Sequence, residues 1–243
     1  MQNLRVHPVP PGIQPGMSAI QPSIREAYAR WAPRYPPTPH NPLMRVEQQF
    51  MLEQWPDISG CTALDLAAGS GRYSQILARN GAANVVALDF CAPMLAQVTG
   101  ALRVCASMQQ LPFAANTFDF VVSGLALGHA TDLALWMREV ARVLRDDGVL
   151  LYSDFHPDAA RMSLTRSFTD EHQQTWTVTH HHHSVEKQRS ALAQAGLLQE
   201  SCSELRVGIE LIEPFAGSDE FYARWHGLAI ALVVKARKQC CTI

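Results

Sequence analysis

The sequence lacks any continuous apolar segment long enough to cross a bilayer. No run approaches the ~20 residues that a membrane-spanning helix needs, and the start of the chain has no apolar signal core. Charged residues make up only 17% of the chain, and the net charge of −2 provides no positive field to attract nucleic acid. We therefore expect neither nucleic acid nor a membrane as a partner.

The six cysteines lack the spacing that metal or disulfide motifs require. They lie at positions 61, 91, 105, 202, 240 and 241 and form no C-x-x-C pair. Cys61, Cys91 and Cys105 fall in or beside predicted core strands, where buried reduced thiols are the simplest interpretation. This pattern predicts a cytoplasmic protein without a metal site, because disulfides persist mainly outside reducing compartments. We expect it to be a monomer or a homodimer.

Proline, in contrast, is concentrated at the start of the chain. Ten of the fifteen prolines lie within residues 1–42, a density that excludes long helices and central strands. We expect residues 1–42 to form a proline-rich tail and lid, with a short helix after Ser23 that carries Tyr28. A helical flap over one sheet edge is the alternative. Residues 43–243 would form the main domain.

The chain is organised around residues 62–71. Residues 62–66 are an apolar run with one acid, followed by a glycine turn and then a helical pattern over residues 72–80. A strand, a glycine turn and a helix open a doubly wound α/β unit, whose ligand lies at the carboxyl end of the strand. Gly69 and Gly71 allow the backbone to approach that ligand closely, and Asp65 faces the same crevice.

The alternation of strands and helices continues and predicts an α/β fold with a mostly parallel sheet. Asp89 ends the second strand, 24 residues after Asp65, where a carboxylate can accept both hydroxyls of a ribose. The further predicted strands are 84–89, 102–106, 118–123, 149–155, 174–178, 203–212 and 228–235. The further predicted helices are 43–54, 93–99, 132–144 and 184–195.

The glycine turn alone does not identify the ligand. A dinucleotide site has G-x-G-x-x-G, and here serine, at Ser74, replaces the third glycine. The decision comes from four runs, LDLAAGSGRY (64–73), ALDFCAPML (87–95), LPF…NTFDFVVS (111–123) and REVARVLRDDGVL (138–150). In this order and spacing, they resemble class I S-adenosylmethionine-dependent methyltransferases, most closely the type 11 branch, which includes quinone C-methyltransferases and malonyl-carrier-protein O-methyltransferases.

The resemblance implies a Rossmann-like, doubly wound, seven-stranded sheet with one antiparallel C-terminal strand, and a substrate-covering insertion around residues 156–183. It also implies that S-adenosylmethionine is the cofactor. The implied cofactor contacts are Asp65, Ala67, Gly69 and Gly71 for the methionine part, Asp89, Phe90 and Met94 for the ribose and adenine, Ser107 and Met108 for the adenine edge, Leu125 behind the sulfonium, and Tyr28 from the lid. The chain departs from the family at Ala67, where a glycine is usual, and at Ser107, where an acid is usual.

Two histidines are candidate bases that could take a proton from the molecule that accepts the methyl group. His129 follows the fourth strand, and His156 follows the fifth, two residues after Asp154. Either imidazole could deprotonate a hydroxyl, an amine or an acidic carbon. Tyr35, Phe155, His181 and His183 are the expected substrate-binding residues. The four consecutive histidines, residues 180–183, favour polar pocket lining over a metal site, because no further ligand is suitably spaced.

The sequence therefore predicts a methyltransferase that acts on oxygen, nitrogen or activated carbon of a small molecule, in specialised metabolism. The alternative within the family is a quinone or carrier-protein acyl methyltransferase. The alternatives outside it are an NAD-dependent Rossmann oxidoreductase and a non-catalytic cofactor-binding protein. The last would explain the departures at Ala67 and Ser107.

Overall fold

The computed structural model describes residues 23–161, 166–169, 175–178, 180–209, 222–223 and 225–240. The predicted proline-rich tail, residues 1–22, lies outside the described residues, as does part of the predicted insertion. Within the described part, no helix is long and apolar enough to cross a membrane.

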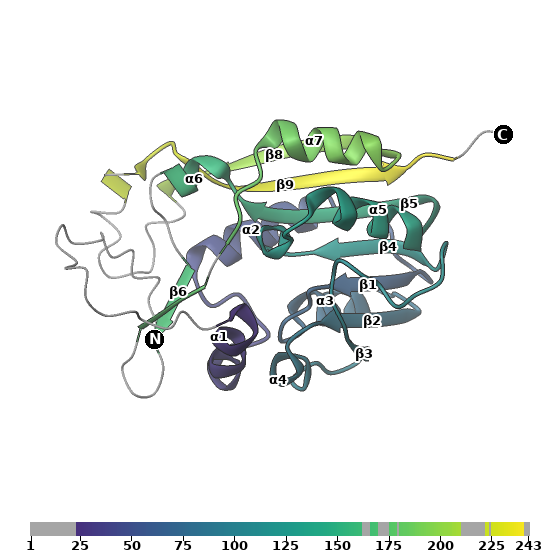
Figure 1. The fold of residues 1–243 in the computed structure, drawn as a ribbon, viewed down its shortest axis with the longest axis horizontal. Helices are drawn as coiled ribbons and strands as arrows, with labels where there is room; N and C mark the ends of the chain where they lie inside the picture. The colour runs from purple at the N-terminus through teal and green to yellow at the C-terminus, as the bar shows by residue number, and fades with distance from the viewer. Residues whose placement is uncertain are drawn as a thin grey trace.

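A seven-stranded sheet forms the centre of the molecule, in the order β3-β2-β1-β4-β5-β9-β8 (Figure 1). The strands are β1 (Thr62–Leu66), β2 (Asn84–Asp89), β3 (Leu102–Cys105), β4 (Phe118–Ser123), β5 (Leu144–Phe155), β8 (Leu197–Arg206) and β9 (Ala229–Lys238). The first five run parallel, and β9 pairs antiparallel with both of its neighbours, β5 and β8. The predicted fold, with one antiparallel C-terminal strand, is confirmed.

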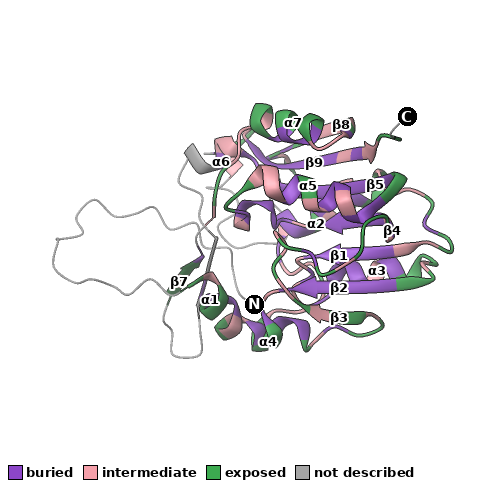
Figure 2. Ribbon diagram, turned by 45° about the vertical axis from the view of Figure 1, so that its right-hand side comes forward, coloured by how far each residue is buried: buried purple, intermediate pink, exposed green. Residues whose placement is uncertain are grey.

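Helices cover both faces of this sheet. The helical elements are α1 (Ile24–Trp31), η1 (Ala32–Arg34), α2 (Pro42–Glu53), α3 (Arg72–Arg79), α4 (Ala92–Leu95), η2 (Leu127–His129), α5 (Leu133–Val143), α6 (Pro157–Arg161) and α7 (Val185–Gln194). Side chains of α2 and α3 pack on one face, and side chains of α5 and α7 pack on the other. The strands between them are buried on both sides, as Figure 2 shows. This explains why their sequences are almost continuously apolar.

The predicted strands 149–155 and 228–235 are longer in the structure, as β5 and β9, and two other predicted strands differ in pairing or position. The segment at 174–178 joins a separate two-stranded sheet, in which β6 (Arg166–Thr169) pairs with β7 (Thr175–Val178). The strand predicted at 203–212 lies instead at 197–206, and residues 210–212 are outside the described part. This strand is at the sheet edge, with four of its ten residues exposed and only two buried, so its sequence is too polar to mark its start.

The helix α1 lies at the end of the sheet to which β1 and β4 point (Figure 1). Its start is fixed by a capping box: Ser23 Oγ accepts from the Glu26 N–H, and the Glu26 carboxylate accepts from the Ser23 N–H. The Gln97 side-chain amide donates to the Ala32 carbonyl at 2.6 Å, which ties the end of this segment to the main domain. The first helix is therefore anchored over the carboxyl ends of the strands.

Candidate active site

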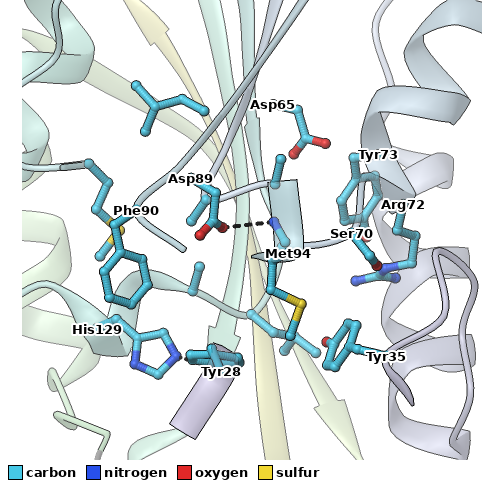
Figure 3. Close-up of a pocket in the computed structure, with 18 of the residues that line it drawn as sticks. Tyr28, Tyr35, Asp65, Ser70, Arg72, Tyr73, Asp89, Phe90, Met94 and His129 are labelled. Carbon is cyan, nitrogen blue, oxygen red and sulfur yellow. Dashed lines mark hydrogen bonds between the residues drawn. The ribbon is translucent and has the colours of Figure 1, made fainter. Parts of the chain in front are cut away.

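A cavity of about 270 Å³ lies at the carboxyl ends of β1, β2 and β4. Helix α1 and the segment that follows it close one side, and the glycine turn after β1 forms the floor (Figure 3). Parallel strands place their carboxyl ends along one sheet edge, and ligands of doubly wound proteins bind there.

The turn after β1 has a backbone that few side chains tolerate. Ala67, Gly69 and Gly71 all have positive φ, at 59°, 56° and 91°. Ala67 is thus in the left-handed region despite its Cβ, a conformation that costs a non-glycine residue of order 1 kcal/mol. A Cβ on Gly71 would also come within 3.0 Å of the Val98 side chain. Ala67 therefore takes a backbone conformation that a glycine would adopt more readily.

Asp89 is held rigidly at the end of β2. Its Oδ2 accepts from the Gly69 N–H and its Oδ1 accepts from the Cys91 N–H, both at 2.8 Å. Burial raises the pKa of this carboxyl, and the backbone N–H donors oppose that rise. Each oxygen has further acceptor capacity, because a carboxylate oxygen carries two lone pairs. The arrangement can receive two hydroxyl donors from a ligand in the cavity.

Asp65 is buried at the end of β1. Its Oδ2 accepts from both the N–H and the hydroxyl of Ser74, each at 2.7 Å. Burial raises its pKa to about 6, although the bonds from Ser74 and the charge of Arg72 act in the opposite direction. In the described part of the chain no donor reaches the other oxygen, Oδ1. A cation in the cavity would favour the ionised form of this carboxyl.

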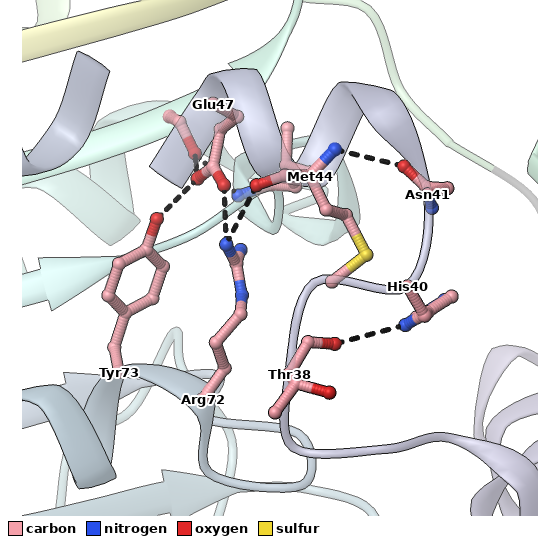
Figure 4. A network of polar contacts seen from close by, with 9 residues as sticks. Thr38, His40, Asn41, Met44, Glu47, Arg72 and Tyr73 are labelled. Atoms are coloured by element: carbon pink, nitrogen blue, oxygen red, sulfur yellow. Dashed lines mark hydrogen bonds and ion pairs between the residues drawn. The ribbon is translucent and has the colours of Figure 1, made fainter. Parts of the chain in front are cut away.

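A buried ion pair that reaches the cavity wall through Arg72 was not predicted from the sequence. Glu47 on α2 is fully buried and accepts from Arg72 at 2.7 Å, from the Tyr73 hydroxyl at 2.8 Å and from the Ser153 hydroxyl (Figure 4). Burial, with the neighbouring Glu47 charge, raises the pKa of Tyr73, which stays a neutral donor. The one sequence signal is that Glu47 falls between Met44 and Met51 on the apolar stripe of its helix. Because Glu47 supplies the counter-charge, the positive charge of Arg72 is neutralised within the protein.

Elsewhere in the cavity wall, the His129 ring contacts the Tyr28 hydroxyl. The Tyr28 hydroxyl and the His129 Nε2 are 2.8 Å apart, and the two rings are nearly perpendicular. Both residues line the cavity, His129 from η2 and Tyr28 from α1 (Figure 3). An imidazole and a phenol joined by a hydrogen bond at a cavity wall can accept and pass on a proton.

The predicted site residues separate into two groups in space. Those that line the cavity are Tyr28, Tyr35, Asp65, Ala67, Gly69, Asp89, Phe90, Met94, Ser107, Met108, Leu125 and His129. Gly71 lies next to it as the N-cap of α3.

The remaining four predicted residues, Phe155, His156, His181 and His183, are not among the cavity-lining residues. The His156 Nδ1 accepts from the Asp158 N–H at 3.1 Å, and its Nε2 lies 3.6 Å from a Glu204 oxygen. The His183 Nε2 is 3.1 Å from the Ala130 carbonyl oxygen. Asp154 lies two residues before His156 in the sequence, but in the structure its carboxylate contacts His180.

A doubly wound sheet with a buried acid at the end of each of its first two strands defines a protein that binds a nucleoside-containing ligand. Residues 64–152 match the family described as "Methyltransferase domain". A malonyl-[acyl-carrier protein] O-methyltransferase from Dechloromonas aromatica is 32% identical over 176 residues, which are 70% of this chain and 64% of that protein. A demethylmenaquinone methyltransferase from Corynebacterium urealyticum is 41% identical over 100 residues, 40% of this chain and 42% of that protein.

A solved structure shares the fold. The crystal structure of an S-adenosylmethionine dependent methyltransferase from Mesorhizobium loti matches with a TM-score of 0.66 and 23% identity, over 79% of this chain and 97% of that chain. The chain is similar to the class I S-adenosylmethionine-dependent methyltransferases of the type 11 branch. This similarity bears out the predicted resemblance and the predicted cofactor, S-adenosylmethionine. The match spans about half the length of the curated relatives.

Proposed function

We propose that this chain transfers the methyl group of S-adenosylmethionine to a small molecule. The observation that carries the proposal is that the buried carboxylates Asp65 and Asp89 line the same cavity as the hydrogen-bonded pair His129 and Tyr28. A sulfonium is already an activated methyl donor. The protein therefore has mainly to align the acceptor with the methyl group and to exclude water.

The cofactor would lie along the glycine turn. Asp89 would hold the ribose hydroxyls, Phe90 and Met94 would flank the ribose and adenine, and Asp65 would face the methionine end. Ser107 and Met108 would meet the adenine edge, and Leu125 would stand behind the sulfonium. Leu125 itself has a positive φ of 54°, a strained conformation of the kind that collects at ligand sites.

A nicotinamide dinucleotide suits this cavity less well. Its pyrophosphate needs positive charge or free N–H donors at the glycine turn. Of the two arginines that line the cavity, Arg72 is paired with Glu47, and Arg25 lies over the Phe90 ring at 5.7 Å. The nearest carboxylates would repel a pyrophosphate, whereas they would attract a sulfonium.

For the acceptor we propose a small molecule of specialised metabolism, deprotonated at oxygen, nitrogen or activated carbon by His129. The position of His129 in the cavity wall favours it over His156, which is held by Asp158 and lies outside the cavity-lining residues. The similarity to a demethylmenaquinone methyltransferase and to a malonyl-carrier-protein O-methyltransferase supports a quinone or a carrier-protein acyl group as the alternative acceptor. A monomer or homodimer in the cytoplasm is proposed with it, in keeping with the free cysteines of the described part.

Calorimetric titration with S-adenosylmethionine, S-adenosylhomocysteine and NAD tests the cofactor. Tight binding of the first two with none of NAD is expected, and the reverse result would overturn the proposal. A mass-spectrometric screen for a 14-dalton gain, over acidic phenols, heterocycles, carboxylates, a demethylmenaquinone analogue and a malonyl carrier protein, then tests the acceptor class. Binding without transfer to any acceptor would favour a non-catalytic cofactor-binding protein.

A further inference from the structure

The His129 ring is held in place by a second imidazole, that of His180. The two rings are nearly perpendicular, at 83°, with centroids 5.3 Å apart. The His180 ring also meets the Phe155 ring edge-on at 5.0 Å, and its side chain is only 7% exposed. His180 therefore fills the space immediately behind the cavity wall formed by His129.

Asp154 stands behind His180. This carboxylate, near the end of β5, is 1% exposed, and its Oδ1 lies 3.2 Å from the His180 Nε2. Neither side chain makes a hydrogen bond in the described part of the chain, so their contact with each other is an approach at ion-pair distance. A carboxylate removed from water is costly unless it has a counter-charge or a donor. The His180 imidazole is the group placed to supply Asp154 with a counter-charge or a donor, so the two side chains form a pair.

The backbone around His180 is tied to the loop that carries His129. The His181 N–H donates to the Gly128 carbonyl at 2.6 Å. Gly128 must be a glycine for this contact, since a Cβ there would collide with the His180 imidazole. Together with the bond between His183 and Ala130, these contacts explain why an internal run of histidines lies beside η2.

We propose that Asp154 and His180 are positioning residues, which hold the His129 imidazole in the orientation in which its Nε2 meets the Tyr28 hydroxyl at the cavity wall. The carboxylate fixes the His180 ring, and the ring fixes His129. This inference rests on the proposed role of His129 as the proton acceptor. The pair itself is behind the wall and does not touch the cofactor site.

The first test observes the His129 ring directly and needs no acceptor. Long-range ¹⁵N–¹H spectra of the full chain with S-adenosylhomocysteine report the protonation of each histidine ring nitrogen, and a His129→Gln variant assigns the signals. In the wild type we expect one fixed tautomer of His129. His180→Gln and Asp154→Asn each keep a polar group of similar size. In these variants we expect the ¹⁵N chemical shifts of the two His129 ring nitrogens to move toward averaged values. His182→Gln is the matched control, because His182 is exposed and contacts His180 from another side.

The second test measures turnover with an acceptor found in the screen. We expect His180→Gln and Asp154→Asn to lower kcat about 10- to 100-fold, as slight misplacement of a catalytic group does, with an unchanged KM for S-adenosylmethionine. The proposal is overturned if the His129 signals and kcat match those of the control, even where Tm falls, since a fall in Tm alone indicates a purely structural pair. If the wild type fails to bind S-adenosylmethionine, the proposed function fails, while apo-protein spectra still decide whether the pair orients His129.

Discussion

Lowering the pH should weaken cofactor binding through Asp65 while it stabilises the free protein. The pKa of this buried carboxyl is raised from 3.8 to about 6. S-adenosylmethionine carries a sulfonium charge that does not titrate, so it should prefer the ionised carboxylate. If only that form binds well, about one molecule in eleven is competent at pH 5, and the Kd should be roughly tenfold higher there than at pH 7.5.

The stability of the free protein should change in the opposite direction. Because the folded-state pKa of Asp65 is raised, the folded protein binds a proton more tightly than the unfolded chain does between pH 3.8 and about 6. The favourable contribution is therefore fully present below pH 3.8 and is lost as the pH rises through about 6. A rise of about two pKa units corresponds to about 3 kcal/mol. Asp89, whose pKa is also raised by burial, would add to this trend.

Calorimetric titration at pH 5, 6, 7 and 7.5, at constant ionic strength, measures the first effect. Urea unfolding of the free protein at the same pH values measures the second effect. Asp65→Asn should bind more weakly at pH 7.5 and show a much flatter pH profile. S-adenosylhomocysteine, which lacks the sulfonium charge, should show a smaller dependence. Equal affinity of the wild type at pH 5 and 7.5, or an undiminished slope in Asp65→Asn, would refute the reasoning.

Three further predictions concern the cofactor, the ion pair and the turn. Asp89→Ala should abolish cofactor binding in calorimetry, whereas His156→Ala should retain both binding and turnover, because His129 is the proposed base and His156 is not among the cavity-lining residues. Glu47→Gln should lower the free energy of unfolding by about 3–5 kcal/mol in urea titrations, because a buried guanidinium loses its counter-charge; a loss below 1 kcal/mol would contradict this. Gly71→Ala should cost more stability than its control Gly100→Ala, which also has positive φ but open space around it, and equal losses would show that the contact is unimportant.

Local patterns in the sequence determined the centre of the fold and the meeting of Asp65, Gly69 and Asp89 at one sheet edge. The apolar runs at 62–66, 84–89 and 118–123 match the observed strands residue for residue. In each case a short buried strand is bounded by turn residues, so neighbours along the chain suffice to mark it. Asp65, Gly69 and Asp89 meet at one edge because parallel strands bring their carboxyl ends together. No distant contact was needed to predict that meeting.

The acceptor side and the buried charges were decided only by tertiary structure. Glu47 meets Arg72 and Ser153 across 25 and 106 residues of chain, and Asp154 meets His180 instead of its near neighbour in sequence, His156. The edge strand β8 was likewise set by pairing with β9 rather than by its own composition. A buried polar side chain is stable only beside the partner that packing delivers to it, and no periodicity in the sequence records which partner that is.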